Sequence, residues 1–93
     1  MQIIRKDFPS ILRENEKAYL SLLEGLVNSI DENSQMEIRM GKEHHSFRIS
    51  PSLPIYINLL VEQVNALHNL LNIKVEYGKS LKNSGSLFFF LPI

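Results

Sequence analysis

The sequence predicts an α+β fold, a two-layer α/β sandwich with two helices on one face of a mainly antiparallel sheet, in the order (β)αββαββ. Two observations carry this prediction. Two segments repeat apolar residues at steps of three and four, which is the period of a helix with one buried face. Several shorter segments alternate apolar and polar residues, which is the pattern of strands that bury one side. Because each helix has one main apolar face, packing both against one side of the sheet buries these residues together.

The N-terminal half is expected to form a short strand, a helix and a hairpin. Residues 2–5 are the first strand, and the helical pattern begins at about Asn15. Residues 36–40 and 46–50 alternate in polarity and predict two paired strands, joined by a turn over residues 41–45. The apolar stripe of the helix consists of Tyr19, Leu22, Leu23, Leu26, Val27 and Ile30.

The C-terminal half is expected to form a second helix and two more strands. Ser52 precedes the second helical pattern and is a candidate N-terminal cap. Residues 73–77 alternate and predict a strand, residues 78–85 a polar loop, and residues 86–93 a final strand. The apolar stripe of the second helix consists of Ile57, Leu60, Val61, Val64, Leu67 and Leu71.

Length and composition limit what the protein does. A chain of 93 residues supports one core, so residues 1–93 are treated as a single domain. Ten basic and ten acidic residues give zero formal net charge, so we expect no nucleic-acid partner, and self-association is permitted. The absence of cysteine excludes disulfides and thiolate metal sites. No apolar run approaches the ~20 residues that a membrane span needs, so we expect a cytoplasmic protein without membrane contact.

A family resemblance appears in the first helix. The segment ENEKAYLSLLEGLVNSIDEN resembles the N-box helix of the Bergerat (GHKL) ATPases, which include DNA gyrase, mismatch-repair ATPases and sensor histidine kinases. Its EGLVNSID portion is similar to the E-x-x-x-N-S-x-D form of that box. In the family the asparagine holds the magnesium bound to ATP, and in the gyrase-like branch the glutamate is the general base. The resemblance places these roles on Asn28 and Glu24, with Asp31 on the same side of the helix.

Two further matches follow in the same order. SLPIYI lies where kinases carry a GLGLAI-type sequence at the start of the next helix. The C-terminal segment LHNLLNIKVEYGKSLKNSGSLFFFLPI resembles the kinase ending LHGG-x-I-x-V-E-S…G-x-G-S-x-F-x-F-x-LP, with a longer helix and one residue fewer between Gly85 and Pro92. The three matches cover the chain from about residue 14 to its end. The residues that match in this last segment are Leu67, His68, Ile73, Val75, Glu76, Gly85, Ser86, Leu91 and Pro92.

The chain lacks the ATP-binding loops of that family. There, a D-x-G-x-G segment whose aspartate binds adenine, a lid and a glycine pair connect the hairpin to the second helix. Here the strand ends at Ser50 and leads directly into the helix, and the glycine positions fall on Ser52 and Pro54. Proline has no N–H to donate to a phosphate. The resemblance therefore implies a degenerate, lid-less domain that is not an enzyme, does not use ATP and needs no cofactor.

The polar candidates also have a simpler interpretation. Glu24, Asn28 and Asp31 are either a remnant nucleotide and magnesium site or polar residues on the solvent side of an amphipathic helix, and the second is favoured. His44 and His45 lie in the expected turn and point apart, so we expect no metal site there. We expect His68 to be a structural or helix-end histidine.

The last strand suggests a contact surface. Alternation directs Phe88 and Phe90 away from the core, where kinases of this type often carry polar residues. Together with Tyr77 these side chains predict an apolar interaction surface, unless the N-terminal segment MQIIRKDF covers them.

The sequence therefore favours a non-catalytic protein-interaction or regulatory domain of a signalling pathway, derived from a histidine-kinase ATPase-like scaffold. Its expected partner is another protein or a second copy, as a homodimer through the C-terminal strand. One alternative is a residual nucleotide-binding or phosphotransfer protein that uses Glu24 and Asn28. Another is an unrelated, permuted ferredoxin-like binding module.

Overall fold

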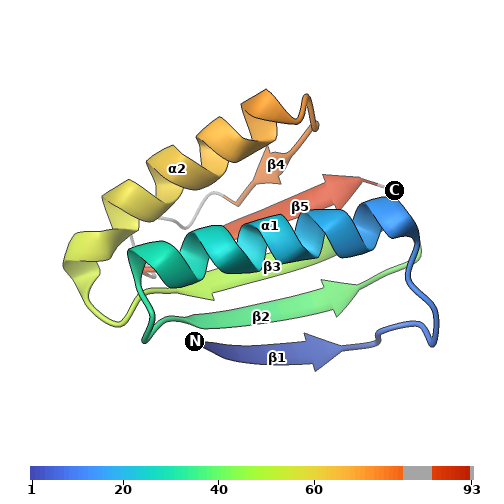
Figure 1. Ribbon diagram of the computed structural model, residues 1–93, viewed down its shortest axis with the longest axis horizontal. Helices are drawn as coiled ribbons and strands as arrows, with labels where there is room; N and C mark the ends of the chain where they lie inside the picture. The colour runs from blue at the N-terminus through green and yellow to red at the C-terminus, as the bar shows by residue number, and fades with distance from the viewer. Residues whose placement is uncertain (79–84, 93) are drawn as a thin grey trace.

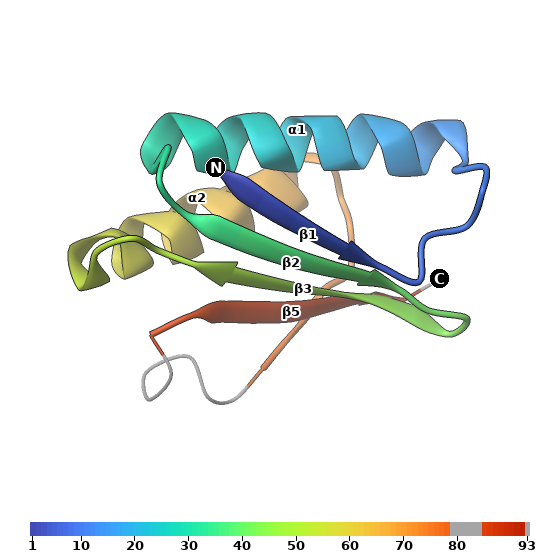
Figure 2. The ribbon, with the colours of Figure 1, turned by 90° about the horizontal axis from the view of Figure 1, so that it is seen from below.

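Five strands form one mixed sheet with two helices on one side, which confirms the predicted fold class (Figures 1 and 2). The computed structural model describes residues 1–78 and 85–92. The strand order is β1-β2-β3-β5-β4. The elements are β1 (Gln2–Lys6), α1 (Glu14–Ile30), β2 (Gln35–Met40), β3 (His44–Ser50), a 3-10 turn η1 (Pro54–Tyr56), α2 (Ile57–Leu70), β4 (Glu76–Tyr77) and β5 (Leu87–Pro92).

The two helices each connect a pair of parallel strands. α1 joins β1 to its neighbour β2, and these two strands pair in parallel. α2 joins β3 to β4, and β5 lies between them, antiparallel to both. The edges of the sheet are therefore β1 and β4, whereas the C-terminal strand β5 is internal.

Strand register separates a buried face from an open face. On the helix side, Ile38 of β2 pairs with Phe47 of β3, which pairs with Phe89 of β5. The Phe47 and Phe89 rings stack with centroids 4.9 Å apart at the centre of the core. Both helices pack over this layer through their apolar stripes (Figure 2). The fully buried core side chains include Leu23, Val27, Met36, Ile38, Phe47, Ile49, Leu60, Val64, Leu87 and Phe89.

Two boundaries differ from the sequence prediction. His44 and His45 belong to β3 and not to a turn, because they pair with Pro92 and Leu91 of β5. The turn is correspondingly tighter, and a Cβ at Gly41 would collide with the carbonyl oxygen of His44. The expected strand over 73–77 is reduced to Glu76–Tyr77. The polar loop expected over 78–85 lies mostly outside the described residues.

Candidate functional site

The three residues of the expected nucleotide and magnesium site have separate surroundings. The Glu24 carboxylate lies 2.9 Å from the Arg5 guanidinium and ties α1 to β1. Asn28 is exposed on α1. Asp31 is 4% exposed and ends the helix. Among residues 1–78 and 85–92, no group of three or more His, Asp or Glu side chains is arranged to hold a metal ion.

Hydrogen bonds of the Asp31 side chain link the end of α1 to the segment that precedes α2. Its carboxylate accepts hydrogen bonds from the Ser52 N–H and the Ser52 hydroxyl, both at 2.7 Å, and from the Asn33 N–H at 3.2 Å. Burial raises the pKa of Asp31, but these hydrogen bonds outweigh burial and leave the pKa below its usual value. Ser52 therefore binds back to the first helix, and the prediction that it caps the second helix is wrong.

Phe88 and Phe90 lie on the open face, the side of the sheet opposite the helices. Their rings meet edge to face at 4.8 Å. The Arg48 guanidinium lies 5.1 Å from the Phe88 ring centroid, and the His44 ring meets Phe90 edge to face at 5.1 Å. The N-terminal strand does not cover this aromatic pair, because β1 pairs with β2 at the far edge of the sheet. Both phenylalanines remain partly exposed.

The structure places Tyr77 on the other face of the sheet. Tyr77 pairs with Phe89, whose side chain is fully buried beneath the helices. A surface formed by Phe88 and Phe90 therefore does not include Tyr77, contrary to the grouping expected from the sequence. Alternation places Tyr77 on one side of its strand, but only the pairing with β5 fixes which side faces the helices.

Tyr77 instead belongs to a hydrogen-bond chain around the buried His68. The Tyr77 hydroxyl donates to Asn65 Oδ1 at 3.1 Å, so its oxygen accepts from His68 Nδ1 at 3.0 Å. His68 Nε2 then accepts from the Tyr19 hydroxyl at 2.6 Å. Burial lowers the pKa of His68 to about 4 and raises the pKa values of Tyr19 and Tyr77. His68 is thus a neutral, structural histidine that joins both helices to β4.

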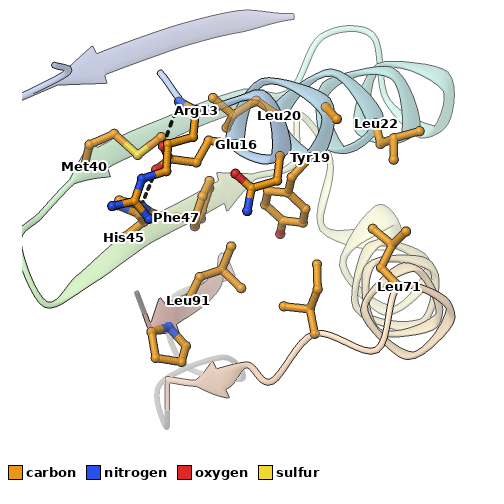
Figure 3. A pocket seen from close by; sticks show the side chains of 14 residues that line it. Arg13, Glu16, Tyr19, Leu20, Leu22, Met40, His45, Phe47, Leu71 and Leu91 are labelled. Carbon is orange, nitrogen blue, oxygen red and sulfur yellow. Dashed lines mark hydrogen bonds and ion pairs between the residues drawn. The ribbon is translucent and has the colours of Figure 1, made fainter. Parts of the chain in front are cut away.

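A cavity of about 460 Å³ opens between the helices, which diverge toward the N-terminal end of α1 (Figure 1). Figure 3 shows Leu22 and Leu71 on its walls and three polar residues, Arg13, Glu16 and His45, gathered at its other end. Apolar side chains line most of the rest, among them Tyr19, Leu20, Met40, Phe47, Ile73 and Leu91.

The sequence analysis did not identify this cavity. Its polar end combines α1 with β3, and Glu16 and His45 are far apart along the chain. No local spacing could bring these two residues together. The structure reveals it at Leu22, which belongs to the apolar stripe of the first helix and yet is 49% exposed where it lines this cavity.

Comparisons with family models, with curated proteins and with solved structures find no match for this chain. The relation to histidine-kinase ATPase domains therefore stays a prediction that rests on the residues quoted above. Neither helix in residues 1–78 and 85–92 has the length and apolar character needed to cross a lipid bilayer.

Proposed function

We propose that this chain is a non-catalytic protein-interaction domain on a histidine-kinase ATPase-like scaffold, and that the open face of its sheet is the contact surface. The observation that carries the proposal is the aromatic pair Phe88 and Phe90 beside Arg48, on a face over which no helix of the described chain lies. Aromatic side chains, phenylalanine included, and arginine are enriched at protein interfaces, and arginine is also enriched among the few residues that dominate the binding energy.

The surroundings of the aromatic pair suit a protein partner. Toward β1 and β2 the open face carries two ion pairs, Lys6 with Glu37 at 2.6 Å and Arg39 with Asp7 at 3.3 Å. No carboxylate of the described residues lies within 4 Å of the Arg48 guanidinium. An apolar centre with a polar, charged rim is the usual composition of a protein interface.

A second copy of the chain is the partner we propose. The zero net charge removes general repulsion between copies, and the open face carries both signs of charge. Because β5 is internal, a homodimer through the C-terminal strand would use the face of that strand and not its edge. Two open faces would then pack as sheet on sheet around a two-fold axis.

The size of this face predicts a weak dimer. Strands about 4.8 Å apart, with a rise of about 3.3 Å per residue and lengths of two to seven residues, give the five-stranded sheet a face of roughly 410 Å². Stable interfaces bury about 800 Å² on each partner, so the contact is at the low end of specific interfaces. We therefore expect dissociation in the micromolar range, as is typical of transient regulatory contacts.

Light scattering coupled to size exclusion tests the dimer. The wild-type mass should rise from 10.7 kDa toward twice that value with concentration. The double variant Phe88→Thr, Phe90→Thr should remain monomeric, because threonine keeps the strand and removes the aromatic contact. Ile55→Thr is the matched control, since Ile55 is an exposed apolar residue of η1 and lies away from the open face. A wild-type chain that stays monomeric up to its solubility limit would refute self-association.

The alternative of residual nucleotide binding or phosphotransfer has less support. Both oxygens of Asp31 already accept hydrogen bonds, and Glu24 is paired with Arg5. Calorimetric titration with Mg-ATP tests this alternative. A heat of binding in the wild type that is absent in Asn28→Ala would favour it. The permuted ferredoxin-like alternative has support from topology, because the β3-α2-β4 crossover around β5 is a split βαβ unit, which ferredoxin-like domains also contain. Both helices lie on one side of the sheet, so this alternative leaves the same open face as the contact surface.

A further inference from the structure

The cavity between the helices has an incomplete apolar lining. Leu22 on α1 is 49% exposed and Leu71, directly after α2, is 37% exposed, and both line it. Ile73, in the connection between α2 and β4, also lines the cavity and is only partly buried. A volume of about 460 Å³ falls in the range of cavities that hold small ligands. An apolar group placed here would remove these three side chains from water.

The polar end of the cavity contains a cation and a ring nitrogen that make no ion pair or side-chain hydrogen bond with the described residues. Glu16 is fully engaged, because one oxygen accepts from the Arg13 backbone N–H at 3.0 Å and the other from His45 Nε2 at 2.8 Å. His45 Nδ1 is buried and has no hydrogen-bond partner among residues 1–78 and 85–92. The Arg13 guanidinium has no carboxylate of the described chain within 4 Å. Arg13 and His45 both line the cavity, so a ligand bound there lies beside both residues.

We infer that this cavity binds a small carboxylic acid with an apolar tail. One carboxyl oxygen would accept from the Arg13 guanidinium. The other would keep the acid's proton and donate its O–H to the lone pair of His45 Nδ1, which is an acceptor because Nε2 donates to Glu16. The tail would lie along Leu22, Leu71 and Ile73. A neutral apolar molecule leaves the guanidinium and Nδ1 unpartnered, and an amine places a cation beside Arg13.

The site lies on the helix side of the sheet and goes beyond the proposed protein contact. The two ideas therefore fail independently. The double variant Phe88→Thr, Phe90→Thr should bind the acid as the wild type does, whether or not the wild type forms a dimer.

The probes are decanoate and decyltrimethylammonium, each below its micellar concentration, and 1-decanol below its solubility limit. We expect decanoate to saturate in an NMR titration and to shift the amide signals of Leu22, Leu71 and Ile73. Decanol should bind about tenfold more weakly, since it lacks the charge-assisted hydrogen bond to Arg13, and the cation should not bind. Equal affinity for the three probes, or shifts confined to Phe88 and Phe90, would overturn the inference.

Two matched pairs of variants locate the ligand. Arg13→Gln should weaken decanoate binding about tenfold, whereas Lys17→Gln removes a nearby cation that does not line the cavity and should leave the affinity unchanged within about twofold. Leu71→Gln should weaken binding, and Leu70→Gln, at a neighbouring residue that is 82% exposed and points elsewhere, should not. If the two variants of either pair change the affinity for decanoate equally, the proposed site is wrong. A cooperative thermal unfolding transition serves as the control that each variant is folded.

Discussion

Acidification should destabilise the folded chain through one buried histidine, His68. Its side chain is 2% exposed and holds the neutral form through hydrogen bonds with Tyr19 and Tyr77. Burial lowers its pKa from 6.5 to about 4. Between these two pH values the unfolded chain binds a proton that the folded chain does not. The free energy of unfolding is therefore highest above pH 6.5 and decreases as the pH falls toward 4.

The size of this effect follows from the pKa difference. A difference between 6.5 and about 4 corresponds to about 3 kcal/mol of stability, lost across that window. This is a large part of the ~5–15 kcal/mol that usually stabilises a small domain. Glu16, Asp31 and Glu37 also have lowered pKa values, so they add to the loss at still lower pH.

A comparison with a variant that lacks only His68 isolates the contribution of this residue. Urea unfolding of the wild type and of His68→Gln, measured from pH 7 to pH 4, should give curves that converge by about 3 kcal/mol as the pH falls. In the wild type, the NMR titration of the His68 ring should show no protonation above about pH 5. Parallel stability curves, or a ring that titrates near its ordinary pKa, would refute the reasoning.

Two further predictions concern single positions. Asp31→Ala should lower the free energy of unfolding by about 2–3 kcal/mol, because it leaves the Ser52 and Asn33 donors without their acceptor. The control Asn28→Ala, on the exposed surface of the same helix, should change the free energy of unfolding by less than about 0.5 kcal/mol. Similar losses in urea unfolding would argue against the linking role of Asp31. Gly41→Ala should destabilise by about 1–3 kcal/mol through the collision with His44, and Gly25→Ala, with open space around its Cβ, should stabilise by about 0.5–1 kcal/mol. A Gly41→Ala melting temperature equal to that of the wild type would contradict the tight turn.

The sequence predicts what depends on periodicity. The two helices and the β2–β3 hairpin follow from the spacing of their apolar residues, and the core positions Leu23, Val27 and Phe47 follow with them. Their burial requires only that each element turn its apolar side inward. The outward direction of Phe88 and Phe90 follows from the same alternation.

The sequence does not predict what depends on pairing between distant segments. Ser52 precedes a helix and has the chemistry of a cap, but the buried carboxylate of Asp31 is a stronger acceptor for it. His45 belongs to a strand because Leu91 pairs with it, and no property of the histidine itself indicates this. The face of Tyr77 is set by its register against Phe89.

The internal position of β5 also determines at which stage of folding the proposed contact surface forms. The β2–β3 hairpin closes a short loop, whereas pairing Ile49 with Leu87 closes a much longer one that contains the whole of α2. The longer closure costs about 2 kcal/mol more in chain entropy. Phe88 and Phe90 acquire their Arg48 and His44 neighbours only through that pairing. A partner that recognises this surface would therefore bind only chains that have finished folding and would ignore nascent or truncated ones.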